Sequence, residues 1–262
     1  RAGNVRVFLY LLDQWVQIGG DIEGEYVGEL FGSSLQISGD GNRVIAGTPY
    51  HDNSDDRDKS GRVRVFELNR GKWTQIGQSL DGPAFNDWLG WSCDINESGS
   101  RVVVGAPRHA AGGFARVYEW NNRDQYWDQL GGSLVNDYDI VQPDDRFGMS
   151  VSIDGDRVAV GGPYKDANGE MDSGFVKVFE WDKNRERWNP VGQVLTGEGR
   201  RELFGWAVSL FGDNLAVGIP GYEMNRGKVL LYKWNSEMEI WDVAQPLYGD
   251  AALDAFGFSV SG

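Results

Sequence analysis

The sequence has one cysteine, no long apolar run and no excess of basic residues, and each absence excludes a class of protein. Cys93 alone cannot form an intramolecular disulfide framework or a cysteine-based zinc cluster. No stretch reaches the roughly 18 apolar residues of a membrane-spanning helix, so we expect no membrane insertion. With a formal net charge of −14, the chain lacks the basic surface that nucleic-acid binding requires, and we expect no nucleic-acid partner.

Helical periodicity is also missing, and a repeated segment takes its place. The segment FGMSVSIDGDRVAVGGP recurs in variant forms, and its last copy is shortened to AFGFSVSG. Two further segments, of the types VKVFEW and WNPVGQVL, follow in step with it. Chance similarity does not keep such a register, so the chain consists of repeats. The glycine that follows Phe or Leu marks each copy, at Gly32, Gly90, Gly148, Gly205 and Gly257.

Each repeat contains four short runs of β-branched and aromatic residues bounded by Gly, Asn, Asp and Pro. Four strands at this period predict an all-β fold, a β-propeller of four-stranded antiparallel blades with about five repeats. We expect one propeller domain over 1–262, with repeats beginning near 31, 89, 147, 204 and 256. The last copy has a first strand near 258–260 but no second strand. The sequence therefore predicts a fragment, either an incomplete ring or part of a larger one.

The repeat resembles the FG-GAP repeat family, which forms the propellers of integrin α subunits. The FG element appears as Phe147-Gly148, with Leu89-Gly90 as a variant, and the GAP element as Gly105-Ala106-Pro107. The resemblance implies a non-enzymatic, extracellular or cell-surface module for protein binding, adhesion or homo-assembly. Integrin-type repeats often carry a calcium loop between FG and GAP. Here that stretch is a tight turn, which is too short to wrap a calcium ion.

Acidic residues concentrate in the loops expected after the second and fourth strands of each blade. These loops hold 22 of the 39 Asp and Glu residues but only 8 of the 25 Lys and Arg residues. In an up-down blade they all lie on one face, where binding loops usually sit on a rigid scaffold. The charge favours a cation or a basic protein partner, or serves solubility alone.

One of these loops has the pattern of a short calcium loop. Oxygen-bearing residues alternate around Gly169 in DANGEMDSG, as they do in loops that wrap calcium, although the last glutamate of an EF-hand is absent. The sequence thus offers calcium as a candidate cofactor, with a site at Asp166, Asn168, Glu170 and Asp172. An ordinary polar loop is the alternative interpretation.

An acidic residue also precedes every FG element. We interpret it as structural, a carboxylate that accepts backbone N–H groups at the turn into the inner strand. The alternative is a ring of ligand-binding carboxylates around the central channel. The five residues are Glu29, Asp87, Asp145, Glu202 and Asp254.

Signatures of catalysis are scarce, so the sequence predicts that the chain is not an enzyme. His51 and His109 lie in loops of different repeats, and no G-x-S-x-G segment occurs. A two-carboxylate glycoside hydrolase stays open as an alternative, although no feature singles out a pair. A lectin-like, glycan-binding propeller is the other alternative. Its candidate stacking residues are Tyr26, Tyr50, Tyr138, Tyr164, Tyr222 and Tyr248.

Overall fold

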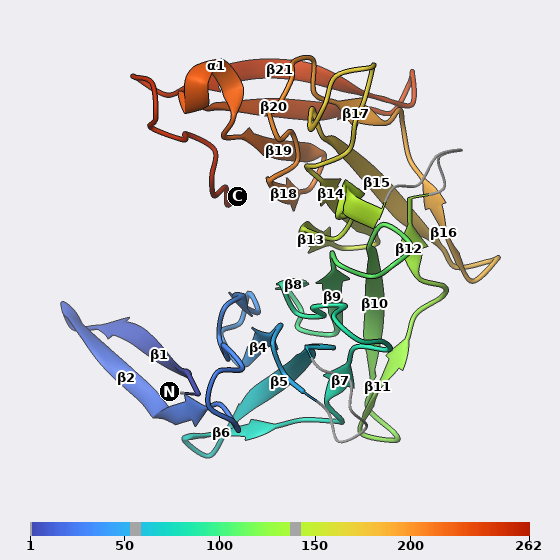
Figure 1. Cartoon of the computed structure of the whole chain (residues 1–262). Helices are drawn as coiled ribbons and strands as arrows, with labels where there is room; N and C mark the ends of the chain where they lie inside the picture. Colours follow the sequence, from blue (N-terminus) through green and yellow to red (C-terminus); the bar gives the residue numbers. More distant parts are fainter. Residues whose placement is uncertain (1, 53–58, 137–142) are drawn as a thin grey trace.

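The computed structural model describes residues 2–52, 59–136 and 143–262. Figure 1 shows five β-sheets placed side by side around an arc, with the two chain ends on either side of its open part. Within the described residues the helical segments are one 3-10 turn, η1 (Pro143–Asp145), and one short turn, α1 (Tyr222–Asn225). The predicted all-β propeller architecture is confirmed.

Four of the sheets are antiparallel blades whose strands follow one another in chain order. In the first three blades the fourth strand comes in two pieces, and both pieces pair with the third strand. Blade 1 has β3 (Leu35–Ile37), β4 (Arg43–Thr48), β5 (Arg62–Asn69), β6 (Lys72–Gln75) and β7 (Leu80–Asp81). Blade 2 has β8 (Ser92–Ile95), β9 (Arg101–Ala106), β10 (Phe114–Asn121), β11 (Tyr126–Gln129) and β12 (Leu134–Val135). Blade 3 has β13 (Ser150–Asp154), β14 (Arg157–Gly162), β15 (Phe175–Asp182), β16 (Arg187–Pro190) and β17 (Leu195–Thr196). Blade 4 has β18 (Ala207–Phe211), β19 (Asn214–Ile219), β20 (Lys228–Asn235) and β21 (Ile240–Tyr248).

The two ends of the chain hold less than a blade each. At the N-terminal end, β1 (Asn4–Leu11) and β2 (Gln14–Glu23) form a two-stranded sheet that corresponds to the outer strands of a blade. At the C-terminal end, the strand expected near 258–260 is absent, and the Gly262 N–H instead donates to Ser209 Oγ at 2.8 Å. In each blade the first strand pairs with the second strand of the same hairpin. Residues 256–262 contain only one strand-forming run, so that run has no second strand to pair with. The division of 1–262 into repeats of one domain stays a prediction.

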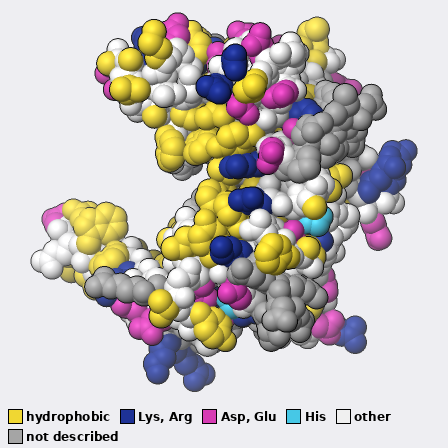
Figure 2. All heavy atoms as spheres, viewed as in Figure 1, with side chains coloured by type: hydrophobic (Ala, Val, Ile, Leu, Met, Phe, Trp, Pro, Cys, Tyr) yellow, Lys and Arg dark blue, Asp and Glu magenta, His cyan; other side chains and the backbone are white. Residues whose placement is uncertain are grey.

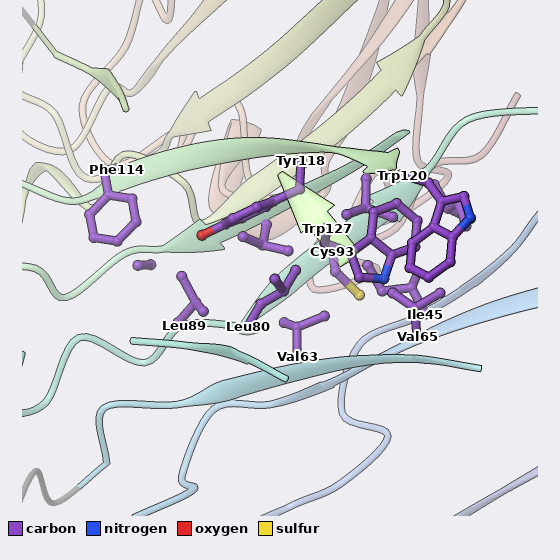
Figure 3. Packing of buried hydrophobic residues seen from close by; sticks show 14 residues of the cluster. Ile45, Val63, Val65, Leu80, Leu89, Cys93, Phe114, Tyr118, Trp120 and Trp127 are labelled. Atoms are coloured by element: carbon purple, nitrogen blue, oxygen red, sulfur yellow. The ribbon is translucent and has the colours of Figure 1, made fainter. Parts of the chain in front are cut away.

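The second strands of blades 2 and 3 are buried on both faces because a blade stacks on either side of each. In β9 the side chains alternate, and three successive valines are 0% exposed. Val102 and Val104 pack with blade 1 residues such as Ile45, whereas Val103 packs with blade 3 residues such as Val158. Figure 3 shows the first of these clusters. This double burial explains why the second strand reads as a nearly continuous apolar run.

Cys93 belongs to the same cluster and is buried. Burial raises the pKa of its thiol to about 12, so the nucleophilic thiolate is scarcely populated at neutral pH. The cysteine therefore fills the core.

A repeated tryptophan joins each blade to the one before it. Its indole Nε1–H donates to a backbone carbonyl in the fourth strand of the preceding sheet or just after it. These bonds combine apolar burial with a satisfied polar atom, which suits an interface between blades. The pairs are Trp73 with Ile18, Trp127 with Ile76, Trp188 with Leu130 and Trp241 with Val191, at 2.9, 3.2, 2.8 and 3.3 Å.

The inner strands of blades 2 and 3 are joined by a buried carboxylate. Asp94 Oδ2 accepts hydrogen bonds from Ser152 Oγ at 3.0 Å and from the Ile153 N–H at 2.8 Å. Burial raises the pKa of Asp94, against the opposing effect of these bonds. A carboxyl whose pKa is raised on folding adds stability below its unfolded-state pKa and loses it as the pH rises through the folded-state pKa.

We therefore expect the wild-type chain to gain stability relative to Asp94→Asn as the pH falls from 7 to about 4, the ordinary pKa of an aspartate. Urea unfolding of both proteins at several pH values measures the difference. A constant difference between the two free energies of unfolding over this range would contradict the raised pKa of Asp94.

Candidate functional site

The loops after the second and fourth strands lie on the same face of the molecule, as the repeat order predicts. Isolated parallel bridges join the end of one blade's loop to the FG element that enters the next blade, at Gly61 with Leu89, Gly113 with Phe147, Gly174 with Phe204 and Gly227 with Phe256. We call this surface the long-loop face. Its described residues are 24–34, 49–52, 59–61, 82–91, 107–113, 143–149, 163–174, 197–206, 220–227 and 249–259.

Three of the five acidic residues before the FG elements are buried beside a basic side chain. The base comes from the loop that follows the second strand of the same blade. The pairs are Glu29 with His51, Asp87 with His109 and Asp145 with Lys165, at N···O distances of 2.9, 2.9 and 3.2 Å. These pairs were not predicted from the sequence, although in two of them an acid and a histidine recur with the same spacing of 22 residues.

Four of these acids also accept a backbone N–H a few residues upstream, so their predicted structural role is confirmed there. Asp87 Oδ2 accepts from Ala84 at 2.9 Å, and burial raises the pKa of Asp87 while the His109 hydrogen bond opposes that rise. Their carboxylates close the turns of the long-loop face. The other three acceptors are Glu29, Glu202 and Asp254, which bond the N–H groups of Glu25, Glu198 and Ala251.

Within the described ranges, the group of three carboxylate or imidazole side chains close enough to hold one metal ion is Glu25, Glu29 and His51. Its ligand atoms are already engaged. The Glu25 carboxylate pairs with Arg62 at 2.9 Å and with Arg64 at 3.3 Å, and Glu29 bonds His51. Two guanidinium charges at this distance repel a cation. The donor set therefore fits a self-compensated ion-pair network and does not fit a metal ion.

The loop proposed for calcium is closed by its own hydrogen bonds. Asp166 Oδ1 accepts the Asp172 N–H at 2.9 Å, and the Asn168 amide donates to Thr196 Oγ1 at 3.1 Å. The structure places the four residues in one turn, but the carboxylates of Asp166, Glu170 and Asp172 do not come together as a metal-sized group. Calcium at this loop stays a prediction.

An apolar groove of about 510 Å³ lies in the long-loop face, where the entrances of the inner strands meet. Its walls come mainly from the residue that follows each FG glycine. We call it the central groove, lined by Leu30, Ser33, Pro49, Tyr50, Trp91, Met149, Trp206, Phe258 and Ser259. Figure 2 shows hydrophobic side chains along the inner side of the arc, with a column of Lys and Arg side chains beside them.

Aromatic contacts within and between repeats build the groove walls. The Trp88 and Trp91 rings stack with centroids 5.1 Å apart, and Trp206 contacts Phe258 at 5.2 Å. Phe258 is 60% exposed, whereas Trp91 and Trp206 at the equivalent positions of their repeats are half-buried. The groove was not predicted from the sequence. The sequence feature that could have revealed the groove is the position after the FG glycine. Large apolar residues recur there, although the repeat places this stretch in a loop.

The tyrosines suggested for sugar stacking do not form one platform. Tyr50 contacts Trp88, Tyr164 contacts Trp206, and Tyr222 contacts Tyr248. Tyr26 lies against the His51 ring, and Tyr138 is outside the described residues. Most of these rings are thus engaged with other aromatic side chains.

Comparison with known proteins supports the same repeat family. The model of the FG-GAP repeat family matches residues 141–179. Integrin alpha-X of Mus musculus is 28% identical over 208 residues, in a match that covers 69% of this chain and 16% of the integrin. Integrin alpha-D of Homo sapiens is 29% identical over 196 residues, in a match that covers 64% of this chain and 15% of the integrin. The predicted resemblance to FG-GAP repeats of the integrin α type is confirmed.

A solved structure of similar fold covers nearly the whole chain. It is the crystal structure of a functionally unknown protein from Desulfotomaculum acetoxidans DSM 771, with a TM-score of 0.63 and 11% identity. The match spans 98% of this chain and 67% of that one. This likeness concerns the fold alone. No helix among the described residues is long and apolar enough to cross a membrane.

Proposed function

Because the chain carries FG-GAP repeats and is similar to integrin α chains, we propose that it is a non-enzymatic module that binds a protein partner in its central groove. The matched stretches are only 16% and 15% of the two integrins, so the activities of the whole integrins enter only as a guide. We propose further that the module acts outside the cell or at its surface. Similarity to integrin α chains supports that location.

The observation that carries this proposal is the exposed aromatic wall of the central groove. Trp91 and Trp206 are half-buried and Phe258 is exposed, on loops held by rigid blades. Large apolar side chains gathered in a concave surface are the usual core of a protein–protein contact. A sugar would need hydrogen-bonding partners for its hydroxyl groups, and the groove offers few polar side chains, Ser33 and Ser259 among them. A peptide segment with an apolar side chain fits this lining better.

Selection of random peptides displayed on phage tests the proposal without knowledge of the natural partner. We expect peptides to be enriched on the folded chain, and Phe258→Asp to weaken their binding at least about tenfold, because it places a charge in an apolar contact. Met238→Asp is the matched control. Met238 is 68% exposed in the turn between β20 and β21, away from the groove, and its change should leave binding intact.

Failure to enrich any peptide, or binding that Phe258→Asp leaves unchanged, would contradict a groove that binds proteins. A glycan array provides the second comparison. Glycan binding that Phe258→Asp abolishes would favour the lectin-like alternative.

We also propose that the loop with Asp166 and Asp172 binds calcium weakly. Calcium would have to displace the hydrogen bond from the Asp172 N–H to Asp166, so we expect a dissociation constant in the range of about 0.1–1 mM that is typical of extracellular modules. At ten times that constant, linkage adds about 1.4 kcal/mol to the free energy of unfolding. The melting temperature should then rise by about 3–5 °C.

Asp166→Asn with Asp172→Asn should remove this rise. Glu237→Gln with Glu239→Gln, in the turn between β20 and β21, removes the same charge elsewhere and should preserve it. Identical melting curves of the wild-type chain in calcium and in chelator would rule out the calcium site and leave the peptide-binding proposal untouched.

A further inference from the structure

Two arginines lie at the edge of the central groove, stacked on aromatic rings. The Arg108 guanidinium lies over Trp88 at 4.5 Å, and Trp88 stacks on Trp91 of the groove wall. The Arg146 guanidinium lies over Tyr164 at 4.2 Å, and Tyr164 contacts Trp206 of the groove wall. Each cation is thus one aromatic ring away from the groove lining.

Neither guanidinium forms an ion pair within the parts of the chain that the structure describes. Their sequence neighbourhoods do contain acids, but those carboxylates are buried and engaged. Asp87, whose backbone carbonyl accepts the Arg108 N–H, pairs with His109. Asp145, which precedes Arg146, pairs with Lys165. In a chain of net charge −14, the two arginines therefore keep their donors for an outside group.

Stacking on an aromatic face leaves the edge of a guanidinium free. The planar group then presents its N–H donors outward in a fixed orientation, which suits a carboxylate held by two parallel hydrogen bonds. The aromatic ring below restricts the side chain, so less conformational freedom is lost when the carboxylate binds.

Resting on the proposed function, we propose that the central groove selects a partner segment in which an Asp or Glu stands next to an apolar residue. The apolar side chain enters between Trp91, Trp206 and Phe258, and the carboxylate bonds Arg108 or Arg146 at the edge. The acidity of the whole long-loop face would suggest a basic partner, whereas the groove is proposed to select an acidic one. The charges next to the groove set this preference, because exposed charges more than about 8–10 Å away from the bound segment are largely screened at physiological salt.

Synthetic peptide pools test this directly. Three pools share random flanks and a central leucine, and differ at the next position, which is Glu, Gln or Lys. Fluorescence anisotropy of the labelled pools should show the Glu pool binding at least about tenfold more tightly than the Gln pool and the Lys pool most weakly. Added salt should weaken the Glu pool most.

The variant Arg108→Gln/Arg146→Gln should reduce binding of the Glu pool to the level of the Gln pool and leave the Gln pool unchanged. The control Arg70→Gln/Arg123→Gln removes the same two charges from exposed turns after β5 and β10, and should change neither. Equal binding of the Glu and Gln pools, or tightest binding of the Lys pool, would overturn the inference. If Phe258→Asp still abolishes the binding of these pools, the peptide-binding function stands and only the preference for an acidic residue is refuted.

Discussion

Replacement of Trp127 by alanine is expected to destabilise the chain by about 3–5 kcal/mol, the range for truncating a fully buried aromatic residue. The side chain is 1% exposed and packs against Trp120 with ring centroids 5.0 Å apart. The change also leaves the Ile76 carbonyl without its donor from the next blade. Urea unfolding followed by circular dichroism measures the loss.

Trp15 provides the matched control for Trp127. It occupies the same position of the repeat, in β2, but is 70% exposed because no sheet covers it. Trp15→Ala should therefore change the free energy of unfolding by no more than about 0.5 kcal/mol. Equal losses in the two variants would show that the repeated tryptophan does not act through contacts between blades.

Gly148→Ala should cost about 2–4 kcal/mol, because two separate effects act at this position. The residue has φ +89°, a left-handed conformation that side chains other than glycine rarely adopt. An added Cβ would also lie 2.3 Å from the Phe114 carbonyl oxygen, which is backbone and cannot turn aside. The glycine is thus required where blade 3 begins against blade 2.

Gly132→Ala is the control for Gly148→Ala. An added Cβ at Gly132 would have nothing within 4 Å, and its φ is not positive. The variant should be neutral or up to about 1 kcal/mol more stable, because alanine restricts the unfolded chain. A loss at Gly148 no larger than at Gly132 would contradict the close approach of the blades.

Structural features that lie within one repeat, such as its turns and strand order, could be predicted from the sequence. The FG glycines mark equivalent positions, all five with φ between +82° and +89°, because each blade needs the same turn. Strand order followed from the four runs of each repeat. In continuous apolar runs such as RVVVGA, successive side chains pack against opposite neighbouring blades.

Features that form where several loops or repeats meet, such as the central groove and the acid–base pairs, could not be predicted. The central groove needs Trp91, Trp206 and Phe258, which follow three different FG elements, and their proximity depends on the arrangement of the blades around the arc. The acid–base pairs were hidden for a similar reason, since Glu29 and His51 come from loops that meet only after the hairpin of blade 1 has formed. The absent strand near 258–260 shows that a strand-forming run is insufficient without a partner strand.

The central claim, that a partner segment binds in the central groove, is tested most directly by ¹⁹F NMR of the chain labelled with 5-fluorotryptophan. Of the eleven tryptophans, Trp88, Trp91 and Trp206 lie at the groove or its edge, and the others belong to third and fourth strands. Addition of the Glu peptide pool should shift the resonances of these three tryptophans and leave the other eight in place. Shifts confined to tryptophans of the third and fourth strands would place the binding site elsewhere and contradict the account.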